Sequence, residues 1–241
     1  MSILSYLQVQ NVTLTFLQGL KQVEILKDIT YQFQKGSSYG LMGASGSGKS
    51  TLLALLSGLE TPTSGQVSLQ GRDLYAGQPD DRLGMCRQLG VLFQSPHLID
   101  ELSLIENIMI KGLIEYQEYD IAYQKAQDLL NQIGLAGKED QRPRSLSGGE
   151  QQRACIARAL FAEPSFIIAD EPTAHLDDAT ARDIMSVLCM YQNEKDAGLL
   201  IATHDAMVLG MLDITLKLEA GNLCTVPCVL PKQAMEQKTY G

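Results

Sequence analysis

The chain has 241 residues, of which 45% are hydrophobic and 20% are charged, and it carries a formal net charge of -9. This size and composition are typical of a soluble globular protein with one large domain, or one domain with a subdomain. The acidic balance argues against nucleic acid as a partner, because neutralising phosphates requires a basic surface. No apolar run approaches the roughly 20 residues that span a bilayer, and no signal peptide is visible, so a membrane role would need a partner.

The cysteines are five in number and scattered along the chain. We therefore expect reduced thiols in a cytosolic protein. Cys224 and Cys228 have a spacing that suggests a metal clip, but the sequence nearby offers no His or Cys pair to complete such a site.

The N-terminal third is predicted to be rich in β-structure. Apolar and polar residues nearly alternate from Leu7 to Phe16, and they alternate strictly from Ile29 to Phe33. A period of two residues is typical of half-buried strands, which we expect to pair antiparallel here. Tyr39 to Met42 follows as a short strand.

The segment after this strand fits the phosphate-binding pattern G-x-x-x-x-G-K-[ST]. It reads Gly43, Ala44, Ser45, Gly46, Ser47, Gly48, Lys49, Ser50, Thr51. Glycines let successive backbone N–H groups curl around phosphate oxygens, and the helix that follows directs its positive end at the same anion. Lys49 is placed to reach the β- and γ-phosphates, and the Ser50 hydroxyl to ligate Mg²⁺. Strand, loop and leucine-rich helix in this order predict nucleotide binding.

Residues 95–145 show no strand pattern and contain several helical stretches, of which Ile121 to Ile133 is the clearest. An amphipathic pattern without strands indicates a helical unit rather than part of a sheet. We therefore expect an inserted helical subdomain there.

The next segment, Leu146 to Arg153, begins a helix with a second possible anion site. Ser147 and Glu150 have capping-box spacing. Gly148 and Gly149 leave the positive end of that helix without side chains, which favours the binding of an anion there. A dimer could place this end over the nucleotide of a second copy.

Two short apolar runs, Phe166 to Ala169 and Leu199 to Ala202, flank a helical stretch. Such runs are typical of strands buried on both faces of a parallel sheet. The first run ends in Asp170 and Glu171, and ligands bind at the carboxyl ends of strands in such sheets. Asp170 is placed to hold Mg²⁺ through water, and Glu171 to orient or deprotonate an attacking water.

The chain is predicted to close with a hairpin from Ile214 to Leu223. The expected fold class is α/β, with a mostly parallel core sheet, an N-terminal antiparallel β subdomain and the helical insertion. We expect one domain over residues 1–228 and a loose tail over residues 229–241.

Residues 146–153 resemble the signature motif of ATP-binding cassette (ABC) ATPases, a family of P-loop NTPases. Other motifs of that family match in chain order. Gln94 resembles the residue of the glutamine loop, Asp177 that of the dimer-contacting D-loop, and His204 the switch histidine. Phe16 stands where the family offers an aromatic ring to adenine. The resemblance covers about residues 5–224.

The resemblance implies ATP and Mg²⁺ as cofactors. The implied catalytic residues are Glu171, His204, Gln94 and Lys49. The implied metal-binding residues are Ser50, Gln94 and Asp170. Nucleotide contacts would come from residues 43–51 and Phe16, and from a second copy through Ser147, Gly148, Gly149 and Asp177.

The function that this resemblance implies is an ATP-hydrolysing subunit that powers a membrane complex, on the cytoplasmic face of the inner membrane. It would bind integral membrane permease subunits near Gln94–Glu101, together with a second copy of itself. The sequence is similar to the lipoprotein-releasing and macrolide-export group, although Ala174-His175 stands where that group often carries Gly-Asn.

Other functions stay open on sequence alone. The alternatives within the family are a polar amino-acid importer ATPase and a cell-division cassette that gates an envelope hydrolase. A non-transport ABC ATPase acting on ribosomes or DNA is disfavoured, because the chain has one cassette and an acidic balance.

Overall fold

The computed structural model of the chain describes residues 6–19, 21–114 and 118–226, so Cys228 and the expected tail over 229–241 lie outside the described residues. The smaller of two sheets is antiparallel, with strand order β2-β1-β4-β5. Its strands are β1 (Tyr6–Gln18), β2 (Lys21–Gln34), β4 (Ser64–Leu69) and β5 (Arg72–Asp73). The alternating pattern read from the sequence belongs to β1 and β2, which bury one face against the core.

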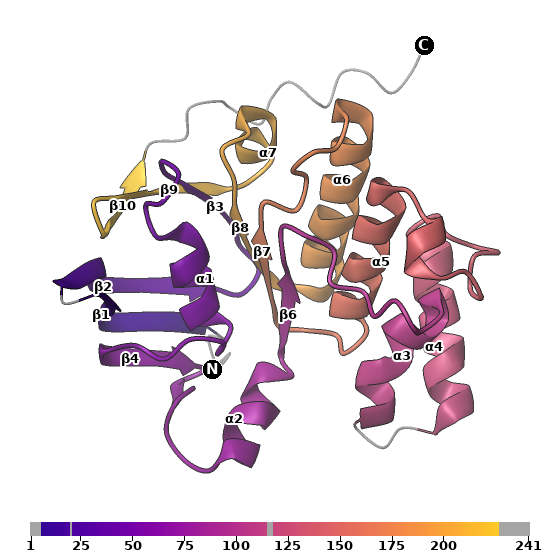
Figure 1. The fold of residues 1–241 in the computed structure, drawn as a ribbon, viewed down its shortest axis with the longest axis horizontal. Helices are drawn as coiled ribbons and strands as arrows, with labels where there is room; N and C mark the ends of the chain where they lie inside the picture. Colours follow the sequence, from indigo (N-terminus) through magenta and orange to yellow (C-terminus); the bar gives the residue numbers. More distant parts are fainter. Residues whose placement is uncertain (1–5, 20, 115–117, 227–241) are drawn as a thin grey trace.

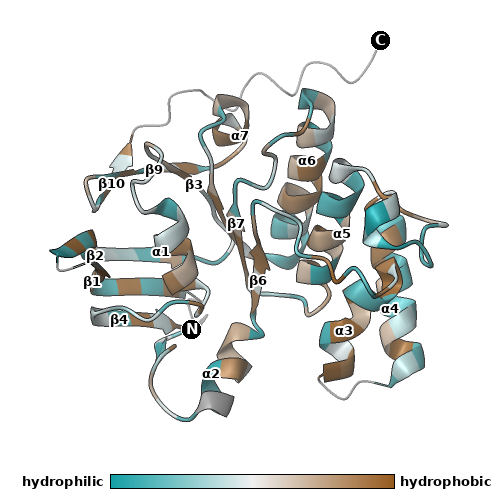
Figure 2. Ribbon diagram, viewed as in Figure 1, coloured by the Kyte–Doolittle hydropathy of each residue, from teal (hydrophilic) through white to brown (hydrophobic). Residues whose placement is uncertain are grey.

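The larger sheet has the strand order β10-β9-β3-β8-β7-β6. Neighbours from β9 to β6 run parallel, and β10 pairs antiparallel with β9. Its strands are β3 (Ser38–Met42), β6 (Leu89–Leu92), β7 (Phe166–Asp170), β8 (Gly198–Ala202), β9 (Ile214–Glu219) and β10 (Asn222–Val226). β8 is buried throughout and β7 at all but its last residue, as their continuous apolar runs predict. Figure 2 shows hydrophobic residues concentrated on β6 and β7.

Helices cover the larger sheet and extend to one side of it (Figure 1). They are α1 (Lys49–Leu56), α2 (Pro79–Cys86), α3 (Leu104–Ile114), α4 (Tyr119–Gln132), α5 (Gly148–Leu160), α6 (Asp178–Lys195) and α7 (Ala206–Gly210), with a 3-10 turn η1 (Pro143–Ser145). No helix within the described ranges is both long and apolar enough to cross a bilayer.

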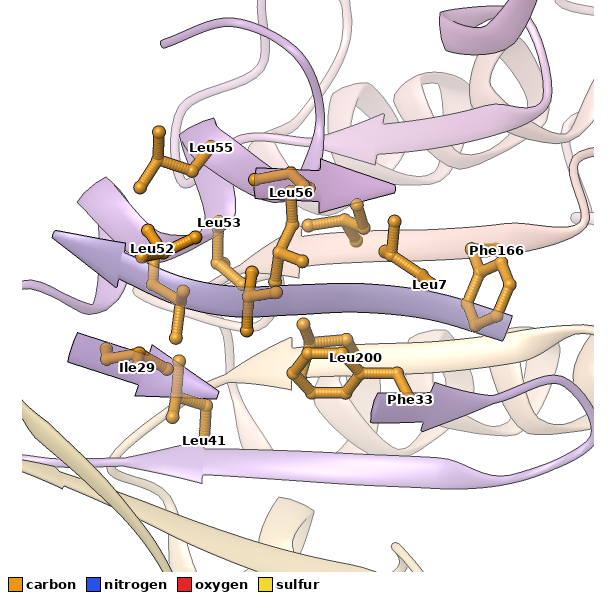
Figure 3. Packing of buried hydrophobic residues seen from close by; sticks show 14 of the residues in the cluster. Leu7, Ile29, Phe33, Leu41, Leu52, Leu53, Leu55, Leu56, Phe166 and Leu200 are labelled. Carbon is orange, nitrogen blue, oxygen red and sulfur yellow. The ribbon is translucent and has the colours of Figure 1, made fainter. Parts of the chain in front are cut away.

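Helix α1 packs between the two sheets, and its leucines tie them together (Figure 3). The buried ones are Leu52, Leu53, Leu55 and Leu56. The same cluster contains Leu7 and Phe33 from the smaller sheet, and Leu41 and Leu200 from the larger one. The first residue of α1 is therefore held at a fixed place relative to the ends of the core strands.

Helices α3, α4 and α5 share a separate apolar core, to which Ile108, Leu130 and Phe161 contribute. Figure 1 shows α3 and α4 on the side of the molecule opposite to β1, β2 and β4. Residues 95–145 contain α3, α4 and η1, and their described part contains no strand.

Leu56→Ala should destabilise the fold by about 2–5 kcal/mol, because it opens a cavity where α1 meets both sheets. The Leu56 side chain is 0% exposed. Leu59→Ala is the matched control, since Leu59 is 59% exposed just beyond the same helix, and it should change stability by less than about 0.5 kcal/mol. Urea unfolding measures both. Equal losses of stability in the two variants would contradict the position of α1 in the core.

Candidate functional site

The phosphate loop, residues 43–48, joins the end of β3 to the start of α1. Gly46 and Gly48 have φ angles of +76° and +100°, which residues with a Cβ rarely adopt. A Cβ on Gly43 would lie 2.5 Å from the Leu218 carbonyl oxygen and 2.6 Å from Ser47 Oγ. The glycines of the loop are thus required by its left-handed turns and by its close packing.

Polar groups in this loop form a cradle that suits phosphate. The Lys49 ammonium donates to the carbonyl oxygens of Gly43 and Ala44 at 2.9 and 3.2 Å. Ser47 Oγ is buried and has no hydrogen-bond partner among the described residues. A cation, an unpaired buried hydroxyl and a helix N-terminus in one loop are the donors that bind phosphate oxygens.

Ser50 and Asp170 line one cavity of about 220 Å³. Asp170 pairs with Ala202 of β8, which in turn pairs with Leu41 of β3, so the ends of three parallel strands lie level beside the phosphate loop. A hydroxyl and a carboxylate are oxygen ligands that suit Mg²⁺ next to a phosphate. Within the described part of the chain, no group of three or more His, Cys, Asp or Glu side chains offers a different metal site.

Glu171 and His204 form a pair at the ends of β7 and β8. Glu171 has a φ of +46°, and its backbone N–H donates to the Ala202 carbonyl at 2.9 Å. Its Oε1 lies 2.9 Å from His204 Nδ1. The hydrogen bond from the Glu171 carboxylate, followed by its negative charge, raises the pKa of His204. The pair thus joins an exposed imidazole to a largely buried carboxylate.

Ser147 caps helix α5 in the predicted capping box. Its Oγ accepts from the Glu150 N–H at 3.4 Å, and the Glu150 carboxylate accepts from the Ser147 N–H at 2.8 Å. A hydrogen bond from Lys138, together with those from Ser147, lowers the pKa of Glu150 to about 2. The capping box therefore stays ionised and leaves Ser147 exposed at the helix end.

Asp177 caps the next helix, α6. Its carboxylate accepts from the N–H groups of Thr180 and Ala179 at 3.0 and 3.1 Å, and these bonds, that of Thr180 first, hold its pKa below the usual range. A cavity of about 270 Å³ is lined by Asp177 together with Ser147, Gly148 and Gly149. The structure thus brings the four residues expected to contact a second copy onto one surface, and no residue of the phosphate loop lines it.

Gln94 lines a different cavity from Ser50 and Asp170, the residues with which it is expected to hold a metal. It is exposed and lines a cavity of about 160 Å³ beside Gly148 and His175. Its neighbour Phe93 is the residue that enters the cavity of Ser50 and Asp170. Strand β6 ends at Leu92, and beyond it Phe93 lines the cavity of Ser50 and Asp170, whereas Gln94 lines the cavity beside the signature segment.

Phe16 is 42% exposed on β1, where it pairs with Val23 of β2. Ile25, two residues along β2, lies against the phosphate loop, since a Cβ on Gly48 would be 2.9 Å from Ile25 Cγ2. The exposed ring is thus at the end of the smaller sheet that meets the loop.

In the segment after Gln94, where permease subunits are expected to bind, one apolar side chain is partly buried and one is exposed. Leu98 is partly buried and packs against two helix clusters, those of α5–α6 and α3–α4. Ile99 is 39% exposed, and its backbone is held by the Asn107 side chain, which accepts from the Ile99 N–H at 2.7 Å and donates to the Ile99 carbonyl at 3.0 Å. Sequence reasoning did not single out Asn107, although a buried amide within an apolar helix is a signal for such a clamp.

The comparisons with known proteins agree with this geometry. Residues 26–174 match the family described as ABC transporter. The lipoprotein-releasing system ATP-binding protein LolD of Syntrophus aciditrophicus (strain SB) is 35% identical, over 91% of this chain and 99% of that protein. A protein of Staphylococcus haemolyticus (strain JCSC1435) named for hemin import, HrtA, is 39% identical, over 90% of this chain and 98% of its own.

Among solved structures, the ATP-binding cassette MJ0796 is similar in a dimeric post-hydrolysis state bound to ADP and Pi. Its TM-score is 0.85 and its identity 30%, over 92% of this chain and 99% of that chain. The expected α/β fold of a P-loop NTPase is confirmed. The chain belongs to the ABC transporter family, in which it is the subunit that binds and hydrolyses ATP.

Proposed function

We propose that this chain powers an exporter or a lipoprotein-extraction complex, as one ABC ATPase domain over residues 1–228 with a helical insertion over 95–145. The Glu171–His204 pair carries the chemical part of the proposal, because it supports a carboxylate base next to the loop that would hold the γ-phosphate. The relatives named LolD support the class of complex. This chain is also similar to HrtA, which is named for another cargo, and that supports cargo selection by the membrane subunit.

The phosphate loop would hold the ATP phosphates, and the Lys49 ammonium would exchange its two loop carbonyls for phosphate oxygens. Ser50, Asp170 and Gln94 would hold Mg²⁺. The bound ion would neutralise phosphate charge. Since Gln94 lines a different cavity from Ser50 and Asp170, it joins them only after the glutamine loop moves. The exposed ring of Phe16 would stack on adenine.

Glu171 would orient and deprotonate the attacking water. Here its Oε1 is engaged by His204. A γ-phosphate would give the imidazole another acceptor, which frees the carboxylate for the water. His204 would then stabilise the charge that develops on the phosphate.

A second copy would complete each site. Ser147, Gly148, Gly149 and Asp177 share an exposed surface at the N-termini of α5 and α6, and the structurally similar cassette MJ0796 is a dimer. A helix N-terminus stripped of side chains suits a γ-phosphate presented by the partner. The two sites would therefore be shared, and each would open when the dimer opens.

Membrane permease subunits would bind near Gln94–Glu101 and place the chain on the cytoplasmic face of the inner membrane. Ile99 is the exposed apolar side chain on that segment, and Phe93 and Leu59 line the nearby cavity that contains Ser50 and Asp170. An exposed apolar group beside the nucleotide residues favours a docking surface. Because Leu98 packs inward, it supports the segment and does not face the partner.

Glu171→Gln should still bind ATP but hydrolyse it at least ~10²-fold more slowly, because the amide keeps the shape and loses the base. An ATP-bound dimer should accumulate on gel filtration. The pKa of His204, followed by NMR titration without nucleotide, should fall towards its ordinary value, because the carboxylate that raises it is gone. Turnover at the wild-type rate would remove Glu171 from the proposed role.

Lys49→Ala should abolish turnover by weakening phosphate binding, whereas Ser147→Arg should bind ATP and fail to hydrolyse it. Mixing the two variants should recover part of the activity, since a mixed dimer contains one complete site. The measurement is ATPase activity of the mixture, with mixed dimers verified by differently tagged copies. Verified mixed dimers without any recovered activity would rule out shared sites.

Ile99→Glu should weaken binding to the membrane subunit at least ~10-fold, because a charge would be buried in the contact. The partner to test is a permease subunit of the extraction type, with a large extracytoplasmic domain, co-expressed and co-purified. Ile121→Glu is the matched control, since Ile121 is exposed on α4, and it should co-purify normally. Normal co-purification of Ile99→Glu would move the docking surface elsewhere.

A further inference from the structure

Gln152 is a buried residue of helix α5 whose side-chain amide nitrogen has no partner. It is 3% exposed, and Nε2 forms no hydrogen bond among the described residues. Buried donors are normally paired, because desolvation without a hydrogen bond is unfavourable. Gln192 on α6 shows the usual case: it is 6% exposed, and its Nε2 donates to the Gly36 carbonyl at 2.8 Å.

The Gln152 side chain lines the same cavity as Gln94, the one of about 160 Å³. The cavity separates three segments that belong to the nucleotide site: the glutamine loop, the start of α5 and the D-loop. Its other lining residues are Ser95, Pro96, Gly148, Ala174, His175 and Leu176. A space of this size between polar groups can be closed by a small movement of the loop, or filled by water.

The glutamine loop offers acceptors on the opposite wall. No backbone hydrogen bond within the described ranges uses the carbonyl oxygens of Gln94, Ser95 or Pro96. Pro96 has no N–H, so its backbone can only accept. An unpaired side-chain donor, and a segment whose carbonyl oxygens accept no backbone hydrogen bond within the described ranges, thus line one cavity.

The other end of this loop is already fixed to the helices. The Arg158 guanidinium, one and a half turns further along α5, donates to the His97 carbonyl. Asn107 clamps Ile99 from α3. Residues 94–96 are therefore the part of the loop that lacks such a clamp, and they are the part that carries Gln94.

We propose that Gln152 is a positioning residue of the ATPase cycle: when ATP is bound, its amide N–H donates to a backbone carbonyl of residues 94–96 and holds Gln94 in place for hydrolysis. Gln152 does not touch the nucleotide in this scheme and acts through Gln94. Helix α5 would then hold the loop at both ends, with Gln152 and Arg158. The inference rests on the role proposed above for Gln94.

Gln152→Leu tests the proposal in the full-length chain with Mg-ATP. The variant removes an unpaired buried amide, so its melting temperature should not fall, whereas kcat should drop ~10-fold or more with KM changed less than ~3-fold. Gln192→Leu is the matched control, since it removes a paired amide away from the cavity. It should lower the melting temperature and leave kcat within ~2-fold. A kcat of Gln152→Leu within ~2-fold of wild type would overturn the proposal.

A second measurement follows the contact itself and does not depend on the Leu variant folding. In Glu171→Gln protein, the Gln152 side-chain amide resonance, identified by its absence from a Gln152→Glu variant, should move downfield and exchange more slowly when ATP is added. An unchanged resonance would mean that the cavity merely holds water, and it would overturn the proposal. Gln94→Ala, assayed in parallel, separates the two inferences. Normal ATP turnover in Gln94→Ala would contradict the role of Gln94. Slow turnover in Gln94→Ala, together with normal turnover in Gln152→Leu, would contradict only the role of Gln152.

Discussion

Burial of the α1 leucines between two sheets is the constraint on which the nucleotide site depends. A leucine such as Leu56 contacts neither phosphate nor metal, yet it fixes the helix whose first turn contains Lys49 and Ser50. The phosphate loop has few side chains with which to hold itself, because glycines occupy its tight turns. Its shape is therefore determined by its two anchors, the end of β3 and the start of α1, and both belong to the same apolar cluster.

The register of the parallel strands positions the residues of the site that do not belong to the phosphate loop. Asp170, Ala202 and Leu41 lie level across β7, β8 and β3, so residues far apart in the chain emerge at one edge. Glu171 and His204 meet across this edge, and the hydrogen bond between them exists only because the strands end together. A slip of one strand by a residue would turn these side chains to the other face. Core packing and chemistry are thus set by the same ladder of backbone hydrogen bonds.

The sequence predicted those parts of the fold in which local pattern and tertiary environment agree. The strand predicted over Phe166 to Ala169, the helix after it and the hairpin predicted over Ile214 to Leu223 carry strong periodicity or turn residues, and the structure has β7, α6 and the pair β9–β10 there. Strand β6 is only four residues long and α2 is poor in buried apolar residues, so neither has a clear local signal. Their positions come from pairing with β7 and from packing near Gly58, where Arg82 contacts the carbonyl.

The motifs in the sequence name the candidate residues of the site, but they do not show how these residues are arranged in space. Motif order names Gln94, Ser50 and Asp170, while the cavities show that Phe93 takes the place next to the last two. Leu98 lies in a segment without helical or strand periodicity, so the sequence does not show that it packs against two apolar clusters. Which way a loop side chain points depends on the helices packed around it, and these come from segments distant in sequence.

Helix α5 is the element that joins these separate parts. Its N-terminal residues line the surface proposed for a second copy, its buried face packs in the cores of both the sheet and the helical insertion, and Arg158 holds the loop that follows Gln94. Side chains packed on two cores leave the helix little freedom to bend, so a displacement at one end is carried to the other as a rigid-body shift. Force applied by a membrane partner at Ile99 would therefore move Ser147, and it would change the distance between the signature segment of one copy and the phosphate loop of the other. In the proposed function, coupling between cargo and ATP hydrolysis then needs two movements together: the two copies close around the phosphates, and residues 94–96 bring Gln94 to the metal while the His204 imidazole leaves Glu171 for the γ-phosphate.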